Sequence, residues 1–226
     1  MGNLVNAITI LVGGTIGVVF KSLLPERMQK TLLSGLGILV ALLGVGMFLE
    51  SDVDFIVLIS ALVVGIISGE WIDIDRYINK LGDYVEKKMH RRAKGNVAQG
   101  FVFASLTYCV GPLAVIGAIN EALGFSETLY IKAAIDGVTS VAFASAMGVG
   151  VIFSAGLVFI YQGAIFLMAT ALGDFFNESM QMFINGAGGI LIVGIGINIL
   201  GIKKIKVANM LPVLLFGMIY FYIIGG

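Results

Sequence analysis

Long apolar runs alternate with short polar connections along most of the chain. The apolar runs cover residues 4–20, 32–49, 55–69, 101–119, 131–147, 149–172, 184–200 and 210–224. Most of them reach the roughly 17–25 residues that a helix needs to cross the hydrocarbon of a bilayer. They lack the alternating polarity of β-barrel strands. The pattern therefore predicts an all-α integral membrane protein with about eight transmembrane helices in a single membrane domain.

One longer polar segment, residues 70–98, separates the third run from the fourth. Apolar residues recur in and around it at steps of three and four, namely Trp71, Ile74, Ile78, Leu81, Val85 and Met89. This spacing predicts a cytoplasmic amphipathic helix. Its later part is basic and contains Lys87, Lys88, Arg91, Arg92 and Lys94. These bases would lie near anionic lipid headgroups, or the helix would be a solvated linker packed on the other cytoplasmic loops.

The composition fits a membrane protein. Of the 226 residues, 58% are hydrophobic and 12% are charged, and the mean hydropathy is +1.02. The chain has one cysteine and one histidine, which excludes a disulfide framework and a Cys/His metal site. No cofactor, metal or nucleic-acid partner is expected.

The charges of the connections predict an orientation. Basic residues lie in alternate connections: Lys21, Arg27 and Lys30, then seven between Arg76 and Lys94, then Lys203, Lys204 and Lys206. The other connections hold Glu50, Asp52, Asp54, Glu121, Glu127, Asp174 and Glu178. Lysine and arginine favour the cytoplasmic side, so eight spans would place both termini outside a bacterial plasma membrane. The first run lacks the basic leader of a signal peptide and is expected to remain as a span.

Glycine is frequent, at 31 residues. Small residues let helices approach closely in lipid, which predicts tight packing inside the chain and, at some positions, a homo-oligomer interface. The segments GLGILVALLGVGMFL (35–49) and GAGGILIVGIGINIL (186–200) resemble each other. They would relate spans 1–3 to spans 6–8 as inverted repeats, an arrangement found in transporters.

Asp136 is the only charged residue between Lys132 and Asp174. A carboxylate inside a membrane span is costly and indicates function by default. Thr139 and Ser140 follow at three and four residues and extend the same helix face, which predicts a substrate or ion site. Three structural alternatives remain open. Asp136 could lie only four or five residues inside its span, pair with Lys132 one turn earlier, or act as an N-cap.

Other candidate site residues lie in neighbouring spans. Gly111 and Pro112 break the fourth run and would free backbone carbonyls for another partner. Four amide side chains fall in the apolar runs or at their ends: Asn6, Gln162, Asn185 and Asn198. An amide in lipid needs a partner, so each faces either a binding site or a structural hydrogen bond.

An enzyme is not expected. An intramembrane protease needs two carboxylates, a serine with a base, or a metal cluster, whereas only Asp136 lies inside a span. A channel would show a charged ring or a repeated pore motif, and neither is visible.

Several segments together resemble a known family. They are VNA, CVGPLAVIGAINEALG, IKAAIDG, FASAMGVGVIFSAG, YQG and GGILIVGIGINILGIKKIKVANMLP. Their combination, over almost the whole chain, resembles the bacterial multi-pass membrane family typified by YdfK and YqgA, a domain of unknown function. The matching positions are Gly111, Pro112, Asp136, Gly137, Gln162, Asn198, Asn209 and Pro212. The resemblance implies an inner-membrane protein of the transporter type and brings no substrate with it.

These observations predict a secondary transporter that moves a small solute or a monovalent cation or proton. Asp136 would bind the substrate or couple its movement to an ion, helped by Thr139, Ser140 and Gln162. The alternatives are a non-transporting membrane scaffold or sensor, in which Asp136 only stabilises the fold, and an ion channel.

Overall fold

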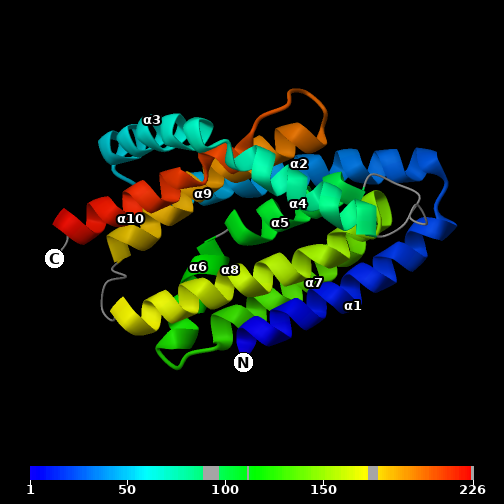
Figure 1. Cartoon of the computed structure of the whole chain (residues 1–226), viewed down its shortest axis with the longest axis horizontal. Coiled ribbons are helices and arrows are strands. Elements are labelled where there is room, and N and C mark those ends of the chain that lie inside the picture. The colour runs from blue at the N-terminus through cyan, green and yellow to red at the C-terminus, as the bar shows by residue number, and fades with distance from the viewer. Residues whose placement is uncertain (89–96, 111, 173–177, 225–226) are drawn as a thin grey trace.

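The computed structural model describes residues 1–88, 97–110, 112–172 and 178–224. These ranges contain α1 (Gly2–Leu23), α2 (Glu26–Glu50), α3 (Phe55–Ile72), α4 (Ile74–Lys88), α5 (Val97–Val110), α6 (Pro112–Ala122), α7 (Glu127–Met147), α8 (Gly150–Leu172), α9 (Glu178–Ile199), the 3-10 helix η2 (Val207–Met210) and α10 (Pro212–Ile224) (Figure 1). The predicted all-α class is confirmed.

Six of the described helices are long and apolar enough to cross a membrane: α1, α2, α3, α7, α8 and α9. The fourth predicted run forms two helices, α5 and α6, whose axes differ by 57°, and the pair would make a seventh span. The last run forms a shorter apolar segment, Val207–Phe221. The predicted break between the fifth and sixth runs is present, because α7 ends at Met147 and α8 begins at Gly150.

Several helices, α7 and α9 among them, begin well before their apolar runs. The run at 131 belongs to α7, which starts at Glu127, and the run at 184 belongs to α9, which starts at Glu178. An acidic residue in the first helical turn is stabilised by the positive end of the helix dipole. Hydropathy alone therefore placed these helix starts too late in the chain.

α1 packs closely against α7 and α8. A Cβ atom on Gly13 would collide with the carbonyl oxygen of Gly137 on α7, and Gly17 meets Val141 in the same way. The residue numbers of the two contacting positions rise together along α1 and α7, so the two helices run parallel. On α8, Gly14 meets Ile152 and Asn6 meets Gln162, so α8 runs antiparallel to α1, as Figure 1 shows.

α2 packs antiparallel against α9. Glycines on both helices make the contact: Gly37 faces Leu200, Gly196 faces Ala41, and Gly44 and Gly189 face each other. A Cβ on Gly44 or on Gly189 would lie 2.6 Å from the carbonyl oxygen of the other residue. Such backbone contact is the usual role of small residues in membrane helices. The two similar glycine-rich segments therefore lie directly against each other.

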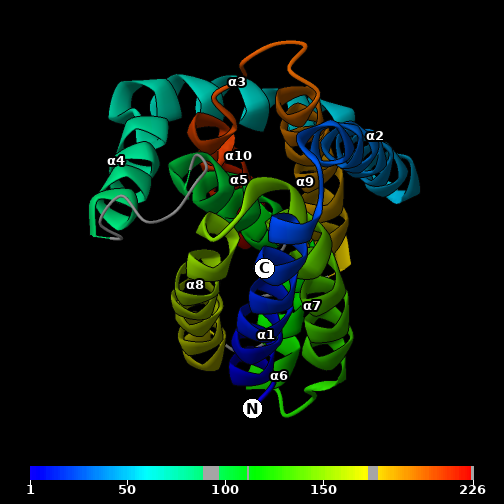
Figure 2. The same cartoon turned by 90° about the vertical axis from the view of Figure 1, so that its right-hand side faces the viewer.

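α3 and α4 lie on the outside of the bundle. α3 contacts α10 where Gly65 meets Val213, and in Figure 2 it runs across the top of the molecule before α4 turns down along one side. The turn between them is at Asp73, whose φ of 55° is left-handed. Lys206 makes an ion pair with Glu70 at 2.9 Å, and this pair ties the end of α3 to the connection before α10.

The predicted amphipathic helix exists as α4, but its apolar residues divide between two faces. Ile74 and Ile78 pack against the main core. Tyr77, Leu81 and Tyr84 are exposed. Trp71 belongs to α3, where it is 88% exposed, because the chain changes direction at Asp73. Met89, Arg91, Arg92 and Lys94 lie outside the described residues.

Candidate functional site

Asp136 lies in the middle of α7. The helix is continuous from Glu127 to Met147, so Asp136 is its tenth residue of 21 and lies roughly 13 Å from the helix start at 1.5 Å per residue. The N-cap alternative is therefore wrong. The estimate of four or five residues inside the span was too small, because the helix starts at Glu127.

Asp136 and Lys132 form a buried ion pair. Lys132 Nζ donates to Asp136 Oδ2 across one helical turn, and the two side chains are only 4% and 8% exposed. Removing two charges from water costs several kcal/mol per ion, so such a pair needs good geometry and further hydrogen bonds. The pair is neutral as a whole, but each partner depends on the other for its charge compensation.

A tyrosine and a serine continue the polar cluster on one side of the pair. Tyr108 of α5 and Ser140 of α7 share a hydrogen bond of 2.7 Å. The ammonium of Lys132 lies 5.8 Å from the centre of the Tyr108 ring, a cation–π distance. Thr139 is less buried, and its hydroxyl donates to the carbonyl oxygens of Ile135 and Asp136. Ser140 therefore joins the cluster directly, whereas Thr139 mainly bonds to its own helix.

Two amides continue the cluster on the other side. Asn6 Nδ2 of α1 donates to Gln162 Oε1 of α8 at 3.2 Å, and the Asn6 side chain also interacts with the Asp136 carboxylate. Both amide residues are fully buried. Asn6 Oδ1 and Gln162 Nε2 have no hydrogen-bond partner among the described residues. Each amide thus has one free polar end inside the protein.

The cluster joins four helices: α1, α5, α7 and α8. α1 is fixed next to it by Thr9, which donates from Oγ1 to the carbonyl oxygen of Ala133 at 2.8 Å. Figure 2 shows α1, α7 and α8 side by side around this part of the bundle. The arrangement can hold a proton or a small charged group, because it combines an exchangeable carboxylate with an ammonium, hydroxyls and unsatisfied amides.

The other predicted site residues lie apart from this cluster. Asn198 closes the turn after α9, with its side chain bonded to both backbone groups of Ile205 at 2.7 Å. Asn185 is half-buried on α9. Pro112 is the first residue of α6, and Gly111 lies outside the described residues. Asn198 therefore has a structural partner.

Sequence reasoning missed Tyr108. The available signal was a tyrosine in the middle of an apolar run, because a buried phenol usually requires a hydrogen-bond partner. Its partner Ser140 was predicted from α7 alone. Nothing in the spacing along the chain could show that α5 brings Tyr108 to it.

Comparison with known proteins assigns the chain to a family. The model described as "Protein of unknown function (DUF554)" matches residues 1–222. The chain belongs to this family. It is 32% identical over 227 residues to the uncharacterized membrane protein YdfK of Bacillus subtilis (strain 168), covering 99% of this chain and 96% of that protein. It is 28% identical over 224 residues to the uncharacterized protein YqgA of Escherichia coli (strain K12), with coverage of 96% and 94%.

No solved structure matches the chain. The membrane description of a relative and the six long apolar helices agree that this is a membrane protein. The family thus supports the membrane assignment and leaves the role of the buried cluster to be argued from its geometry.

Proposed function

We propose that this membrane protein is a secondary transporter of the bacterial plasma membrane, in which Asp136 couples the movement of a small solute to that of a proton or monovalent cation. The observation that carries the proposal is the buried Lys132–Asp136 pair in the middle of α7. Ionisable residues inside membrane spans typically mark substrate or ion pathways. Protonating Asp136 would release Lys132, and this exchange is the chemistry that ion coupling requires.

The arrangement of the helices also supports a transporter. Each of the first three helices packs against a helix of the last three: α1 against α8, α2 against α9, and α3 against α10. Inverted repeats that meet around a midplane site are common in secondary transporters. The angle of 57° between α5 and α6 resembles the discontinuous helices found at such sites. Tyr108 lies on α5, two residues before its end.

The proposed topology has eight spans with both termini outside. It counts α5 with α6 as one bent span and takes α10 as the last. In Figure 1 the α1–α2 connection, α4 and the α9–α10 connection lie in the right-hand half, and the α6–α7 connection and the C-terminus lie in the left-hand half. This division agrees with basic connections on the cytoplasmic side.

In a homo-oligomer, the interface between copies would have to involve glycines outside α1. Gly13 and Gly17 already contact α7, whereas Gly35 and Gly46 of α2 have no described atom within 4 Å of a built Cβ. We therefore place a second copy against the outer face of α2. Cross-linking through Gly46→Cys in membranes would show it as a dimer band.

The alternative function is a non-transporting scaffold or sensor. The direct contact between Lys132 and Asp136 favours this alternative if the pair never opens.

A flux screen tests the proposed transport against this alternative. The purified protein would be reconstituted in liposomes on a solid-supported membrane and challenged with pools of organic acids, amino acids, sugars and monovalent cations. We expect a current that depends on both the protein and one solute or, where the coupled movements balance in charge, a protein-dependent change of the internal pH or uptake of labelled solute. The absence of protein-dependent current, pH change and uptake with every pool would contradict the proposed transport.

A further inference from the structure

A line of polar groups, half-buried at its outer end and buried further in, connects one end of the bundle to Asp136. At that end, Glu121 of α6 accepts a hydrogen bond from the backbone N–H of Asn3 at 3.2 Å and also bonds to that of Gly2. Asn3 Nδ2 donates to the carbonyl oxygen of Phe159 on α8 at 3.1 Å. Polar groups therefore gather where α1 begins, next to both α6 and α8.

The line continues inward between α1 and α8. One turn after Asn3, Asn6 donates to Gln162 and interacts with Asp136. Asn3 and Asn6 lie three residues apart on α1, so their side chains share one face. The distance from Asn3 to the level of the carboxylate is about two helical turns, or roughly 10 Å.

This line is unusual in its hydrogen bonding. Among the described residues, five buried side-chain polar atoms have no hydrogen-bond partner, and three of them are Asn3 Oδ1, Asn6 Oδ1 and Gln162 Nε2. The other two, on Ser105 and Asn209, belong to α5 and η2. Exchanging the oxygen and nitrogen of both hydrogen-bonded amides would still leave one atom of each unpartnered. A buried polar atom without a partner costs roughly 1–3 kcal/mol, and water ordinarily satisfies such atoms.

Beyond Asp136 lie Ser140 and Tyr108, which are hydrogen-bonded to each other, and the core around them is apolar and tightly packed. Ile10, one turn after Asn6 on α1, is fully buried in the main core together with Val151 and Phe143. The backbones of α1 and α7 touch at Gly13 and Gly137. The side-chain hydroxyl of Ser154, also buried, bonds within its own helix to Val151 at 2.6 Å. The polar line thus ends at the ion pair and the adjacent Tyr108–Ser140 hydrogen bond.

We infer that the seam between α1 and α8 is a hydrated half-channel through which water and protons reach Asp136 from the end of the bundle where α1 begins. The inference rests on the proposed function, because it supplies the route by which the coupling carboxylate exchanges its proton. It also assigns a direction: access in this conformation is from one side, and the packed core around Ile10 closes the other.

Cysteine accessibility tests this half-channel independently of transport. The single native thiol, Cys109, is buried and would be replaced by alanine. Single cysteines would then be placed at Asn6 and Gln162, with matched controls at Ile10 and Val158. The controls lie one turn from the test positions on the same helices, and all four residues are 0% exposed. Each pair therefore compares the polar line with the adjacent apolar core.

The probe is Ag⁺, added as nitrate in chloride-free buffer to one side of sealed vesicles, and the remaining thiol is counted by mass spectrometry. We expect Asn6→Cys and Gln162→Cys to react at least ten-fold faster than Ile10→Cys and Val158→Cys, and only from the side of Glu121. If one test variant fails to fold, the other pair decides. Equal rates within both pairs would overturn the half-channel. Fast labelling of Asn6→Cys, together with no solute-dependent transport by the parent protein in the flux screen, would support the half-channel and contradict the transporter.

Discussion

The backbone of Gly13 on α1 touches the carbonyl oxygen of Gly137 on α7, one residue after Asp136. This contact sets the distance between the helix that carries Asn6 and the helix that carries the ion pair. A side chain at position 13 would collide with backbone atoms of α7, and no change of rotamer could relieve that collision. The position of Asp136 relative to α1 therefore depends on a glycine.

The first prediction concerns this contact. Gly13→Ala should lower the free energy of unfolding by about 1–3 kcal/mol, the usual cost of overpacking. The control is Gly156→Ala on α8, where a Cβ meets no described atom within 4 Å. Alanine there should be neutral or stabilising by up to about 1 kcal/mol because it favours the helix. Unfolding in detergent micelles would measure both, and equal losses would contradict the described packing.

The second prediction concerns the ion pair. Lys132→Met or Asp136→Leu alone should each cost about 3–5 kcal/mol, because each leaves an uncompensated buried charge. The double variant should recover at least half of the summed loss, since a neutral, apolar pair needs no compensation. Detergent unfolding of the four proteins forms a double-mutant cycle. Strictly additive losses would show that the two side chains do not interact.

An exposed pair provides the control for this cycle. Lys206 and Glu70 are 47% and 46% exposed, and the hydrogen bond that Lys206 donates to the Glu70 carboxylate raises the pKa of Lys206. Because the pKa of Lys206 is higher in the folded protein than in the unfolded chain, the pair stabilises the fold fully at pH values below the ordinary lysine pKa. This stabilisation is lost as the pH rises through the raised pKa of the folded protein. At neutral pH, Lys206→Met should therefore lower the free energy of unfolding far less than Lys132→Met does.

The third prediction separates a structural asparagine from the site. Asn198→Ala should cost about 1–3 kcal/mol, because it removes two hydrogen bonds to Ile205 and leaves that backbone unpartnered. Solute-dependent current per folded protein should stay unchanged. Asn185→Ala, on the same helix, should change stability by less than about 0.5 kcal/mol. A selective loss of current in Asn198→Ala would return this residue to the binding site.

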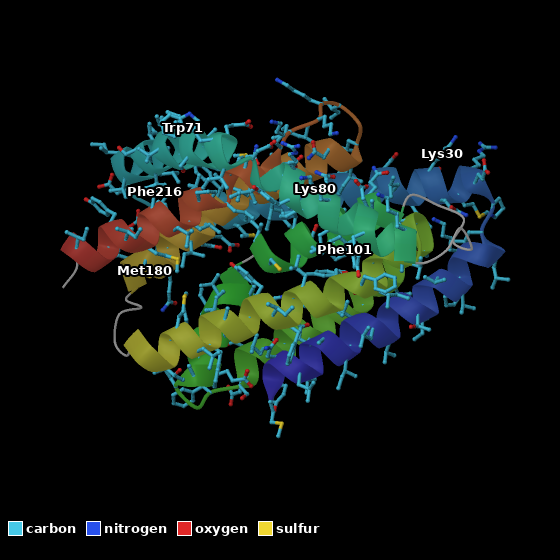
Figure 3. The ribbon with its side chains drawn as sticks, viewed as in Figure 1. Lys30, Trp71, Lys80, Phe101, Met180 and Phe216 are labelled. Carbon is cyan, nitrogen blue, oxygen red and sulfur yellow. The ribbon has the colours of Figure 1, made fainter. Side chains whose placement is uncertain are left out.

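The fourth prediction uses the only tryptophan, Trp71. Trp71 lies on α3 and Lys80 on α4 in Figure 3, and the exposed face of α4 carries Arg76 and Lys87 beside Tyr77 and Tyr84. Aromatic and basic side chains together favour an anionic headgroup layer. Brominated phosphatidylglycerol should therefore quench Trp71 fluorescence more than brominated phosphatidylcholine at equal mole fraction.

The matched variant for this measurement is Lys80→Glu/Lys87→Glu, which should remove the preference for the anionic lipid. Both side chains are exposed, so the fold should not change. Equal quenching by the two lipids in the parent protein would favour the solvated linker helix instead.

The sequence predicted the helical class and the separate apolar runs because hydropathy reports directly on burial in lipid. It also singled out Asp136 and Lys132, since one helical turn separates them. It could not find the hydrogen bond from Tyr108 to Ser140 or that from Asn6 to Gln162, because these depend on which helices pack together. The frequency of glycine predicted close helix contacts but not which residues make them, as the contact of Gly13 with Gly137 shows. The helix start at Glu127 was missed because polar first turns carry no hydropathy signal.

The central claim is that Asp136 couples transport, and the direct measurement is solute-dependent current, or labelled-solute uptake where the transport is electroneutral, in proteoliposomes containing the parent protein, Asp136→Asn or Asp136→Glu. With the most active solute of the flux screen, we expect Asp136→Asn to lose at least nine-tenths of the current. Asp136→Glu, which keeps an exchangeable carboxylate, should retain a measurable part. The purified variants must elute as folded protein. A folded Asp136→Asn protein that carries the full current of the parent would contradict the account.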